Sequence, residues 1–128
     1  MAKATTVSTE GVFQDITCRQ HHLTADEPQG NGGTDRAPAP YELLLASLGA
    51  CSSATLRLYA ARKGWELGRI EVVATFARDE AGVETIRRQV SLGAPLDADQ
   101  RARLAEIIEK TPVTKTLKRS MTITTTFP

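Results

Sequence analysis

Residues 40–63 have the sequence PYELLLASLGACSSATLRLYAARK, and this stretch decides the fold. Pro40 suits the first turn of a helix, because the N–H that proline lacks has no partner there. Gly64 follows Lys63 directly and is typical of a helix end. Between Glu42 and Arg57 every residue is apolar or small. A surface helix would carry one polar face, so the pattern predicts a helix that is buried on most sides.

Many side chains in the middle of this helix are small, which would let other backbones approach it closely. They are Ala46, Ser47, Gly49, Ala50, Ser52, Ser53 and Ala54. A chain of 128 residues has little material with which to surround such a helix on all sides. We therefore expect a second subunit to help cover it.

The residues before the helix predict two strands and a loop. β-Branched and apolar residues recur at roughly alternate positions from Val12 to Leu23, which predicts one strand. A turn at Glu10-Gly11 would pair it with a short strand over Thr5–Thr9. The stretch from Asp26 to Pro40 is rich in glycine and proline, which break helices and permit turns. It predicts an ordered loop that leads into the helix.

The residues after the helix predict a β-hairpin. Apolar residues alternate with other residues in Ile70–Phe76, and again in Val83–Leu92, as expected for strands with one buried face. Asp79–Gly82 lies between them and supplies a turn. Because the two strands are adjacent in sequence, they are expected to pair antiparallel.

A second helix and a final strand complete the chain. Asp97 and Gln100 form a capping-box pattern at the start of this helix, and Pro112 ends or bends it. Met121–Phe127 alternates at period two, which predicts a strand. The order of strands, long helix, hairpin, helix and strand predicts an α+β fold and not a doubly wound parallel sheet. The length suggests a single domain over residues 1–128.

The composition argues against several classes of partner. Sixteen Lys and Arg stand against fifteen Asp and Glu, so a net charge of +1 gives no reason to expect nucleic acid or an anionic membrane. No stretch approaches the roughly 20 apolar residues that cross a bilayer, and the amino terminus lacks the apolar core of a secretory signal. We therefore expect a cytoplasmic protein. The only close histidine pair is His21-His22, which supports a zinc site poorly, and no cofactor is indicated.

Cys51 is the first candidate for chemistry. A free cysteine in a helix most often fills space as a small hydrophobe. The functional alternative needs a thiolate, because the ionised sulfur is the nucleophile. Residues near Cys51 on the same helix carry no charge, so a stabilising cation must come from elsewhere. The candidates are Arg36 in the preceding loop, Arg19 in the early strand, and Arg57 from another subunit.

Other candidates have simple structural interpretations. Cys18 lies on a predicted strand, and nothing in the sequence places it near Cys51, so a structural role is favoured. His21 and His22 suit surface or hairpin positions. Thr111 precedes Pro112, where it would mark a helix end.

Several separated blocks of the chain, in the right order, resemble the OsmC/Ohr family. The first extends from the loop to Cys51 and includes GGTD at residues 32–35 and APAPYELLLASLGAC at residues 37–51. The second is YAARKGW at residues 59–65, and the third is TPVTKTL at residues 111–117. The likeness runs from about residue 22 to the end of the chain.

The resemblance implies an OsmC-like fold, in which antiparallel sheets pack around a long central helix and a second helix. It implies an intertwined homodimer with two active sites at the subunit interface. It also implies a thiol peroxidase that reduces organic hydroperoxides with two cysteines and is restored by a dithiol such as a lipoyl group. Cys51 matches the cysteine that attacks the peroxide.

The chain departs from the family pattern at two positions. The second cysteine normally precedes the proline of the third block, where this chain has Thr111. Threonine cannot form a disulfide, so only Cys18 could replace the missing partner. The family's catalytic glutamate lies ten residues before the attacking cysteine, where this chain has Tyr41, and Glu42 follows one position later. The family's arginine comes from a loop or strand before the helix, and Arg36 and Arg19 are the candidates for it.

Two main hypotheses follow for the function. The first is a one-cysteine peroxidase for oxidative-stress defence, in which Cys51 attacks an organic hydroperoxide and an external thiol resolves the product. The second is a dimer that has lost turnover and binds a small apolar or thiol-bearing ligand. A third possibility is thiol modification or disulfide exchange that involves Cys18.

Overall fold

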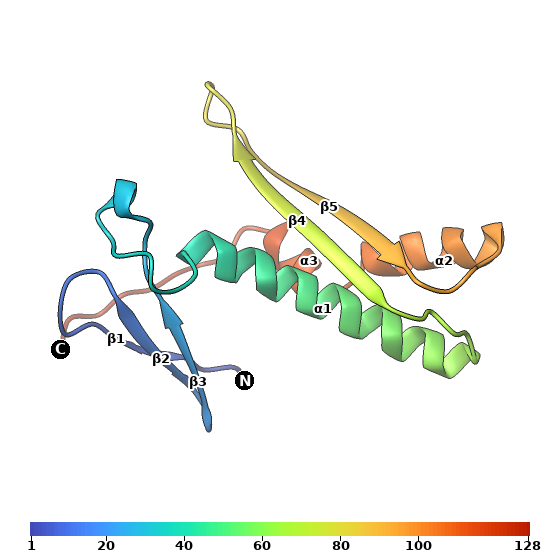
Figure 1. Cartoon of the computed structure of the whole chain (residues 1–128), viewed down its shortest axis with the longest axis horizontal. Helices are drawn as coiled ribbons and strands as arrows, with labels where there is room; N and C mark the ends of the chain where they lie inside the picture. The colour runs from blue at the N-terminus through green and yellow to red at the C-terminus, as the bar shows by residue number, and fades with distance from the viewer. The chain divides into compact units, whose positions relative to one another are not determined.

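The computed structural model describes residues 1–128 and has a mixed α+β architecture with antiparallel sheets and three α-helices (Figure 1). This confirms the predicted fold class. The internal contacts divide the chain into two compact units, Met1–Leu45 and Ala46–Pro128. That the whole chain forms one domain stays a prediction.

The first unit contains a three-stranded antiparallel sheet in the order β1-β2-β3. Its strands are β1 (Thr5–Val7), β2 (Gln14–Cys18) and β3 (His21–Ala25). The predicted single strand from Val12 to Leu23 is therefore wrong, because the chain reverses between Cys18 and His21.

The alternating pattern concealed this turn for a physical reason. Ile16 of β2 pairs directly with Leu23 of β3, so the two apolar side chains share a face of the sheet although they lie on different strands. The turn between the strands also lacks the glycine, asparagine or proline that usually marks one. Arg19 adopts the left-handed conformation in their place, with φ of 57°.

A loop follows the sheet and includes the 3-10 turn Gln29–Asn31. The backbone N–H of Asp26 donates to Pro38 O at 3.0 Å, which closes the loop just before helix α1. This confirms the ordered loop that glycine and proline predicted. Further backbone hydrogen bonds inside the loop join Glu27 to Asp35 and Pro28 to Gly33.

Helix α1 (Pro40–Lys63) has the predicted bounds, and Gly64 ends it with φ of 70°. Its burial differs from the prediction. Only one stripe is buried, at four-residue spacing: Leu48, Ser52, Leu56 and Ala60. In this single chain the helix is therefore not buried on most sides.

By length and composition α1 is long and apolar enough to cross a membrane, which corrects the expectation that no stretch approaches that length. The core helix of a soluble protein passes the same test.

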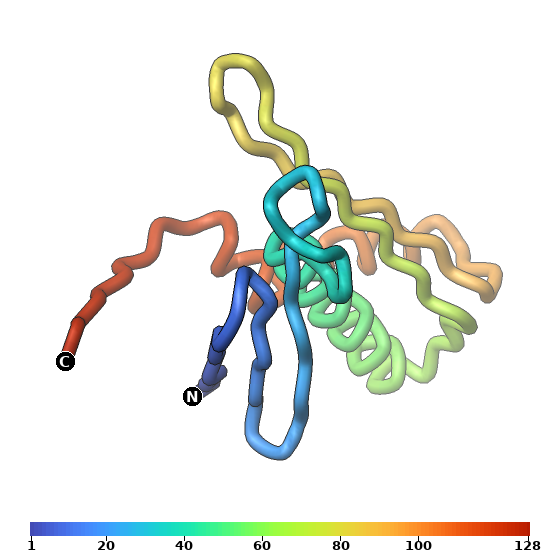
Figure 2. Tube along the Cα trace, turned by 60° about the vertical axis from the view of Figure 1, so that its left-hand side comes forward, coloured from blue at the N-terminus to red at the C-terminus, as the bar shows by residue number.

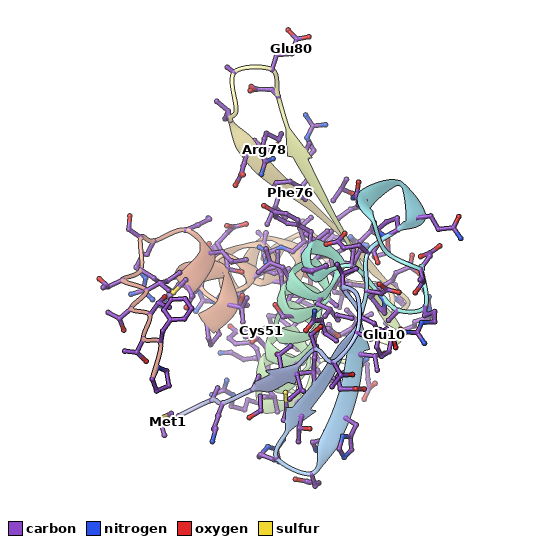
Figure 3. All side chains as sticks on the ribbon, turned by 90° about the vertical axis from the view of Figure 1, so that its left-hand side faces the viewer. Met1, Glu10, Cys51, Phe76, Arg78 and Glu80 are labelled. Atoms are coloured by element: carbon purple, nitrogen blue, oxygen red, sulfur yellow. The ribbon has the colours of Figure 1, made fainter.

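The second unit is built around the antiparallel hairpin of β4 (Ile70–Arg78) and β5 (Glu84–Leu92), as predicted. One end of the hairpin belongs to the hydrophobic core, which joins buried residues of α1 and α2. The core consists of Leu56, Ala60, Leu67, Leu104 and Ile108, with Ile70, Val90 and Leu92 packed against it. The other end projects beyond the helices, with Phe76, Arg78 and Glu80 progressively nearer its tip (Figure 3).

Two helices follow the hairpin. Helix α2 (Ala98–Ile108) begins with the predicted capping box, in which the Asp97 carboxylate accepts from Gln100 N and the Gln100 side chain accepts from Asp97 N. Helix α3 (Pro112–Leu117) follows after a short break, with Pro112 in its first turn. Pro112 thus separates two helices.

The predicted final strand over Met121–Phe127 is wrong for this chain. These residues have no regular structure, and the end of the chain runs on as an extended tail (Figure 2). Ile123 and Phe127 are 85% and 95% exposed. An alternating sequence forms a strand only where another strand supplies hydrogen bonds, and no strand of this chain pairs with the tail.

Candidate functional site

Cys51 lies midway along α1 as a free, half-buried thiol (Figure 3). Its neighbour Ser52 belongs to the buried stripe, about 100° around the helix. Ala50 and Ala54 are exposed. Cys51 therefore sits at the border between the packed stripe of the helix and its uncovered apolar flank.

Ser52 is the only polar residue in the buried stripe, and it is fully buried. Its hydroxyl donates to Leu48 O at 2.6 Å. The same oxygen accepts from Nη1 of Arg88 at 2.9 Å. A serine inside a helix often bonds to the carbonyl four residues before it, but here the oxygen also receives a charged donor from another element.

Arg88 occupies an inward position of strand β5. It shares its face with Ile86, Val90 and Leu92, as the alternating burial of the strand shows. Its direct partner on β4 is Ala74, whose small side chain leaves room for the long one opposite. The Arg88 side chain is 11% exposed.

Four acceptors surround the Arg88 guanidinium. Nη1 donates to Ser52 Oγ at 2.9 Å and to Thr114 Oγ1 at 2.7 Å. Nη2 donates to Ile108 O and to Glu109 Oε1, each at 3.3 Å. We call these five residues the Arg88 cluster. It connects β5 with α1, with the end of α2 and with α3.

Thr111, which the family resemblance places at the position of the second cysteine, is completely buried beside this cluster. Its Oγ1 lies 2.6 Å from Thr114 Oγ1. Thr114 already accepts from Arg88 and can donate to Ile108 O at 3.4 Å. The simplest arrangement of protons therefore has Thr111 donating to Thr114. The Thr111 hydroxyl is therefore a buried group with a hydrogen-bond partner.

Glu109 stands at the outer edge of the cluster. Its carboxylate accepts from Lys118 Nζ at 2.7 Å as well as from Arg88. The hydrogen bond from Lys118 and the two positive charges hold the pKa of Glu109 below its usual value. The carboxylate therefore stays ionised and partly balances the Arg88 charge.

A second buried charge lies in the first unit. The Asp26 side chain accepts from Thr34 Oγ1 at 2.6 Å and from the backbone N–H groups of Glu27, Thr34 and Arg36. These hydrogen bonds, led by the one from Thr34 Oγ1, lower the pKa of Asp26 to about 2. The carboxylate ties together the two ends of the loop.

Arg36 and Glu42, both predicted as site residues, have local partners. The Arg36 guanidinium lies over the Phe13 ring at 4.1 Å, and its Nε donates to Thr34 Oγ1. Glu42 Oε2 accepts from Ala39 N at 3.2 Å, as a glutamate in the first turn of a helix commonly does. Their roles at Cys51 stay predictions.

The remaining candidates are spread over separate elements. Cys18 is a half-buried free thiol at the end of β2, where it pairs across the sheet with His21. His22 is exposed on β3, and Arg57 is exposed on α1. Arg19 lies in the tight turn between β2 and β3.

Comparisons with known proteins identify the family of this chain. A family model described as OsmC-like protein matches residues 32–126, which is most of the chain. The chain belongs to the OsmC-like protein family. This confirms the predicted family. A search of curated proteins finds no match.

Solved structures of OsmC-like proteins show the same fold. An OsmC-like protein from Mycoplasma pneumoniae has a TM-score of 0.77 at 20% identity, over 92% of this chain and 87% of that one. An organic hydroperoxide resistance protein OsmC from Legionella pneumophila gives 0.71 at 16%, over 92% and 89%. The organic hydroperoxide resistance protein of Bacillus subtilis gives 0.62 at 23%, over 92% and 90%.

Sequence reasoning missed most of the Arg88 cluster in this OsmC-like chain. Two signals could have pointed to it. Arg88 stands in the apolar phase of an alternating strand, and Ser52 stands in the phase of the buried helix stripe. A polar residue inside an apolar repeat indicates a buried polar contact, although the repeat cannot name its partner.

Proposed function

We propose that this OsmC-like protein is a thiol-dependent peroxidase that defends against oxidative stress by reducing organic hydroperoxides at Cys51. The observation that carries the proposal is the free, half-buried thiol of Cys51, which the sequence resemblance matches to the attacking cysteine of the family. The similar structures from Legionella pneumophila and Bacillus subtilis are organic hydroperoxide resistance proteins. We expect this protein to be located in the cytoplasm, where thiol reductants are available.

The reaction begins with attack of the Cys51 thiolate on an oxygen of the peroxide bond. The O–O bond breaks, an S–O bond forms, and a proton completes the alcohol product while the sulfur becomes a sulfenic acid. The substrate is reduced by two electrons, and the sulfur is oxidised by two.

An external thiol completes the proposed cycle. The first thiol molecule displaces water from the sulfenic acid and forms a mixed disulfide with Cys51. A second one releases the Cys51 thiol and leaves as the oxidised disulfide. The buried hydroxyl of Thr111 supports this one-cysteine cycle, because the family's usual second thiol is missing.

Arg36 and Glu42 belong to the same proposal as candidate site residues, Arg36 to stabilise the thiolate. Replacing Arg36 by Met and Glu42 by Gln tests them separately. If they act in the reaction, each change lowers the rate of hydroperoxide reduction by at least about tenfold, which is the scale of a lost charged contact in a transition state. Unchanged rates would refute a role in the reaction, and the contacts of Arg36 with Phe13 and of Glu42 with Ala39 would then be structural only.

The homodimer is also part of the proposal, with its sites at the subunit interface. Large apolar side chains remain uncovered in the second unit, with Leu58 of α1 64% exposed and Val73 of β4 51% exposed. A second copy would cover such a surface. Sedimentation of the wild type as a dimer and of Leu58→Glu as a monomer would support this. A monomeric wild type at micromolar concentration would refute it.

The central experiment traps the sulfenic acid. Reduced protein is mixed with cumene hydroperoxide in the presence of dimedone, and the modified cysteine is identified by peptide mass spectrometry. We expect the adduct on Cys51, its loss in Cys51→Ser, and its retention in the control Cys18→Ser. Hydroperoxide consumption no faster than that by free cysteine would contradict the peroxidase proposal.

The threonine at position 111 also favours the alternative of a binding dimer without turnover, because it leaves no second thiol at the usual position. Cys51 would then only line a site for a small apolar or thiol-bearing ligand. Thermal stabilisation of Cys51→Ser by such compounds, together with an inert wild type, would support it. A lack of stabilisation across a broad panel would count against it.

A further inference from the structure

We propose that Arg88 is a positioning residue for Cys51, which holds the turn of α1 next to the sulfur against the beginning of α3. The inference rests on the proposed function, because it concerns the reaction of Cys51. Arg88 acts through Ser52 and Thr114, and nothing in the sequence had assigned it a role.

The hydrogen bonds of Arg88 fix the orientation of its guanidinium. Each Nη atom carries two hydrogens, and the four acceptors around Arg88 account for all of them. The side chain is 11% exposed. A solvated surface arginine would not be enclosed in this way, so the group is a clamp between elements of the second unit.

Nη1 of Arg88 joins α1, which carries Cys51, to α3, which begins next to Thr111. Nη1 binds Ser52 of α1 and Thr114 of α3 at the same time. Ser52 has little freedom to move, because its side chain is fully buried and bonded to Leu48 O. Cys51 is joined to Ser52 through the backbone and shares the same helical turn.

The same clamp reaches the position of the missing cysteine. Thr111 bonds to Thr114, which bonds to Arg88, which bonds to Ser52. This chain of contacts leads from the family's second-cysteine position to the neighbour of the attacking cysteine. In a one-cysteine cycle both the hydroperoxide and the external thiol must reach Cys51, so its placement governs both steps.

Two variants break the clamp at different points. Arg88→Met removes the guanidinium, and Ser52→Ala removes only its link to α1 with a residue that favours helix. The matched controls are Arg87→Met, on the opposite and exposed face of β5, and Ser53→Ala, outside the buried stripe. For each protein two rates are measured at Cys51: sulfenic acid formation with cumene hydroperoxide, and alkylation by iodoacetamide.

We expect Arg88→Met to lower the hydroperoxide rate constant by about tenfold to a hundredfold, the range for a reactant displaced by about 1 Å. Ser52→Ala should lower it severalfold, and Arg88→Lys should recover part of the loss. Alkylation needs no aligned peroxide and should change less than about twofold. A merely structural role would instead open the site and raise the alkylation rate.

The outcomes separate this inference from the proposed function. If the wild type reacts with hydroperoxide and both Arg88→Met and Ser52→Ala match their controls, the positioning role is refuted and the peroxidase stands. If the wild type forms no sulfenic acid, both proposals fall. If Arg88→Met does not fold, Ser52→Ala alone decides.

Discussion

The two units of the chain each bury a charged side chain, and they satisfy it in opposite ways. Asp26 receives all its hydrogen bonds from residues at most ten positions away, within one loop. Arg88 binds partners 20 to 36 positions away, on three other elements. The first charge closes a loop on itself, whereas the second ties elements together.

The two charged side chains therefore differ in what depends on them: Asp26 supports its own loop, whereas Arg88 supports the surroundings of Cys51. The donors around Asp26 come mainly from the backbone, so the loop needs few particular side chains beyond Asp26 and Thr34. The Arg88 cluster depends on side chains from several elements, and one of them adjoins Cys51. We therefore expect changes at Asp26 and Thr34 to act on local structure, and changes in the cluster to act on the proposed reaction of Cys51.

The largest expected effect is at Gly33 in the loop. A Cβ at this position would overlap the carbonyl group of Glu27, which is backbone and cannot move aside. Gly33→Ala should therefore unfold the loop, and hydrogen exchange of the amides of residues 26–38 should approach the rate of an unstructured chain. Gly30→Ala is the matched control, because its added Cβ meets nothing within 4 Å. Equal protection in the two variants would refute the self-closing loop.

The next effect concerns the stability of the second unit. Arg88→Met removes four hydrogen bonds and should lower the free energy of unfolding by about 1–3 kcal/mol. Trp65, the only tryptophan, packs against the core of this unit, so its fluorescence during urea unfolding reports the loss. Arg87→Met should stay within about 0.5 kcal/mol of the wild type. If the two variants had the same free energy of unfolding, the hydrogen bonds of Arg88 would add no stability beyond that of an exposed arginine on the same strand.

Acid should destabilise the loop of the wild type more than the loop of the variant Asp26→Asn, which lacks the carboxylate. The pKa of Asp26 falls from 3.8 to about 2 on folding, so the folded state binds fewer protons. Its stabilising contribution is present above about pH 4 and is lost as the pH falls towards 2. The protection of the loop amides against hydrogen exchange, relative to an unstructured chain at the same pH, should fall over this range in the wild type but not in Asp26→Asn, which still contains Glu109. The same fall in protection in both would contradict this account.

The smallest expected effect shows which hydrogen-bond donor lowers the pKa of Asp26. The hydroxyl of Thr34 is the largest cause of the lowered pKa of Asp26. Thr34→Val should raise that pKa towards its usual value, whereas Thr34→Ser keeps the hydroxyl and should change it little. Carbon-13 NMR titration of the Asp26 carboxyl group measures both. Identical titrations in the two variants would assign the shift to the backbone donors alone.

The elements set by local chemistry were predicted best. Pro40 and Gly64 bounded α1 correctly, because each acts through its own backbone geometry. The capping box at Asp97 and the turn before Glu84 were likewise predicted from neighbouring residues. Such signals need no knowledge of the rest of the fold.

The failures involve partners that the sequence does not name. The turn at Arg19 has no residue typical of a turn, and the tail after residue 120 has the alternating pattern of a strand although nothing in this chain pairs with it. The Arg88 cluster was missed for the same reason. Its partners are far apart in sequence, and no local pattern relates Ser52 to Thr114. Cys51 is a candidate from its position in the helix alone, and the family resemblance adds its expected role as the attacking cysteine.

The long reach of the Arg88 contacts also bears on the order of folding events. A loop of about ten residues closes in tens of nanoseconds, so the Asp26 contacts can form early and reform quickly after each opening. Contacts that enclose 20 to 36 residues must await the hairpin and three helices, and they cost more chain entropy. We therefore expect the surroundings of Cys51 to be assembled late, so that a newly made chain holds this thiol before the Arg88 cluster has formed next to it.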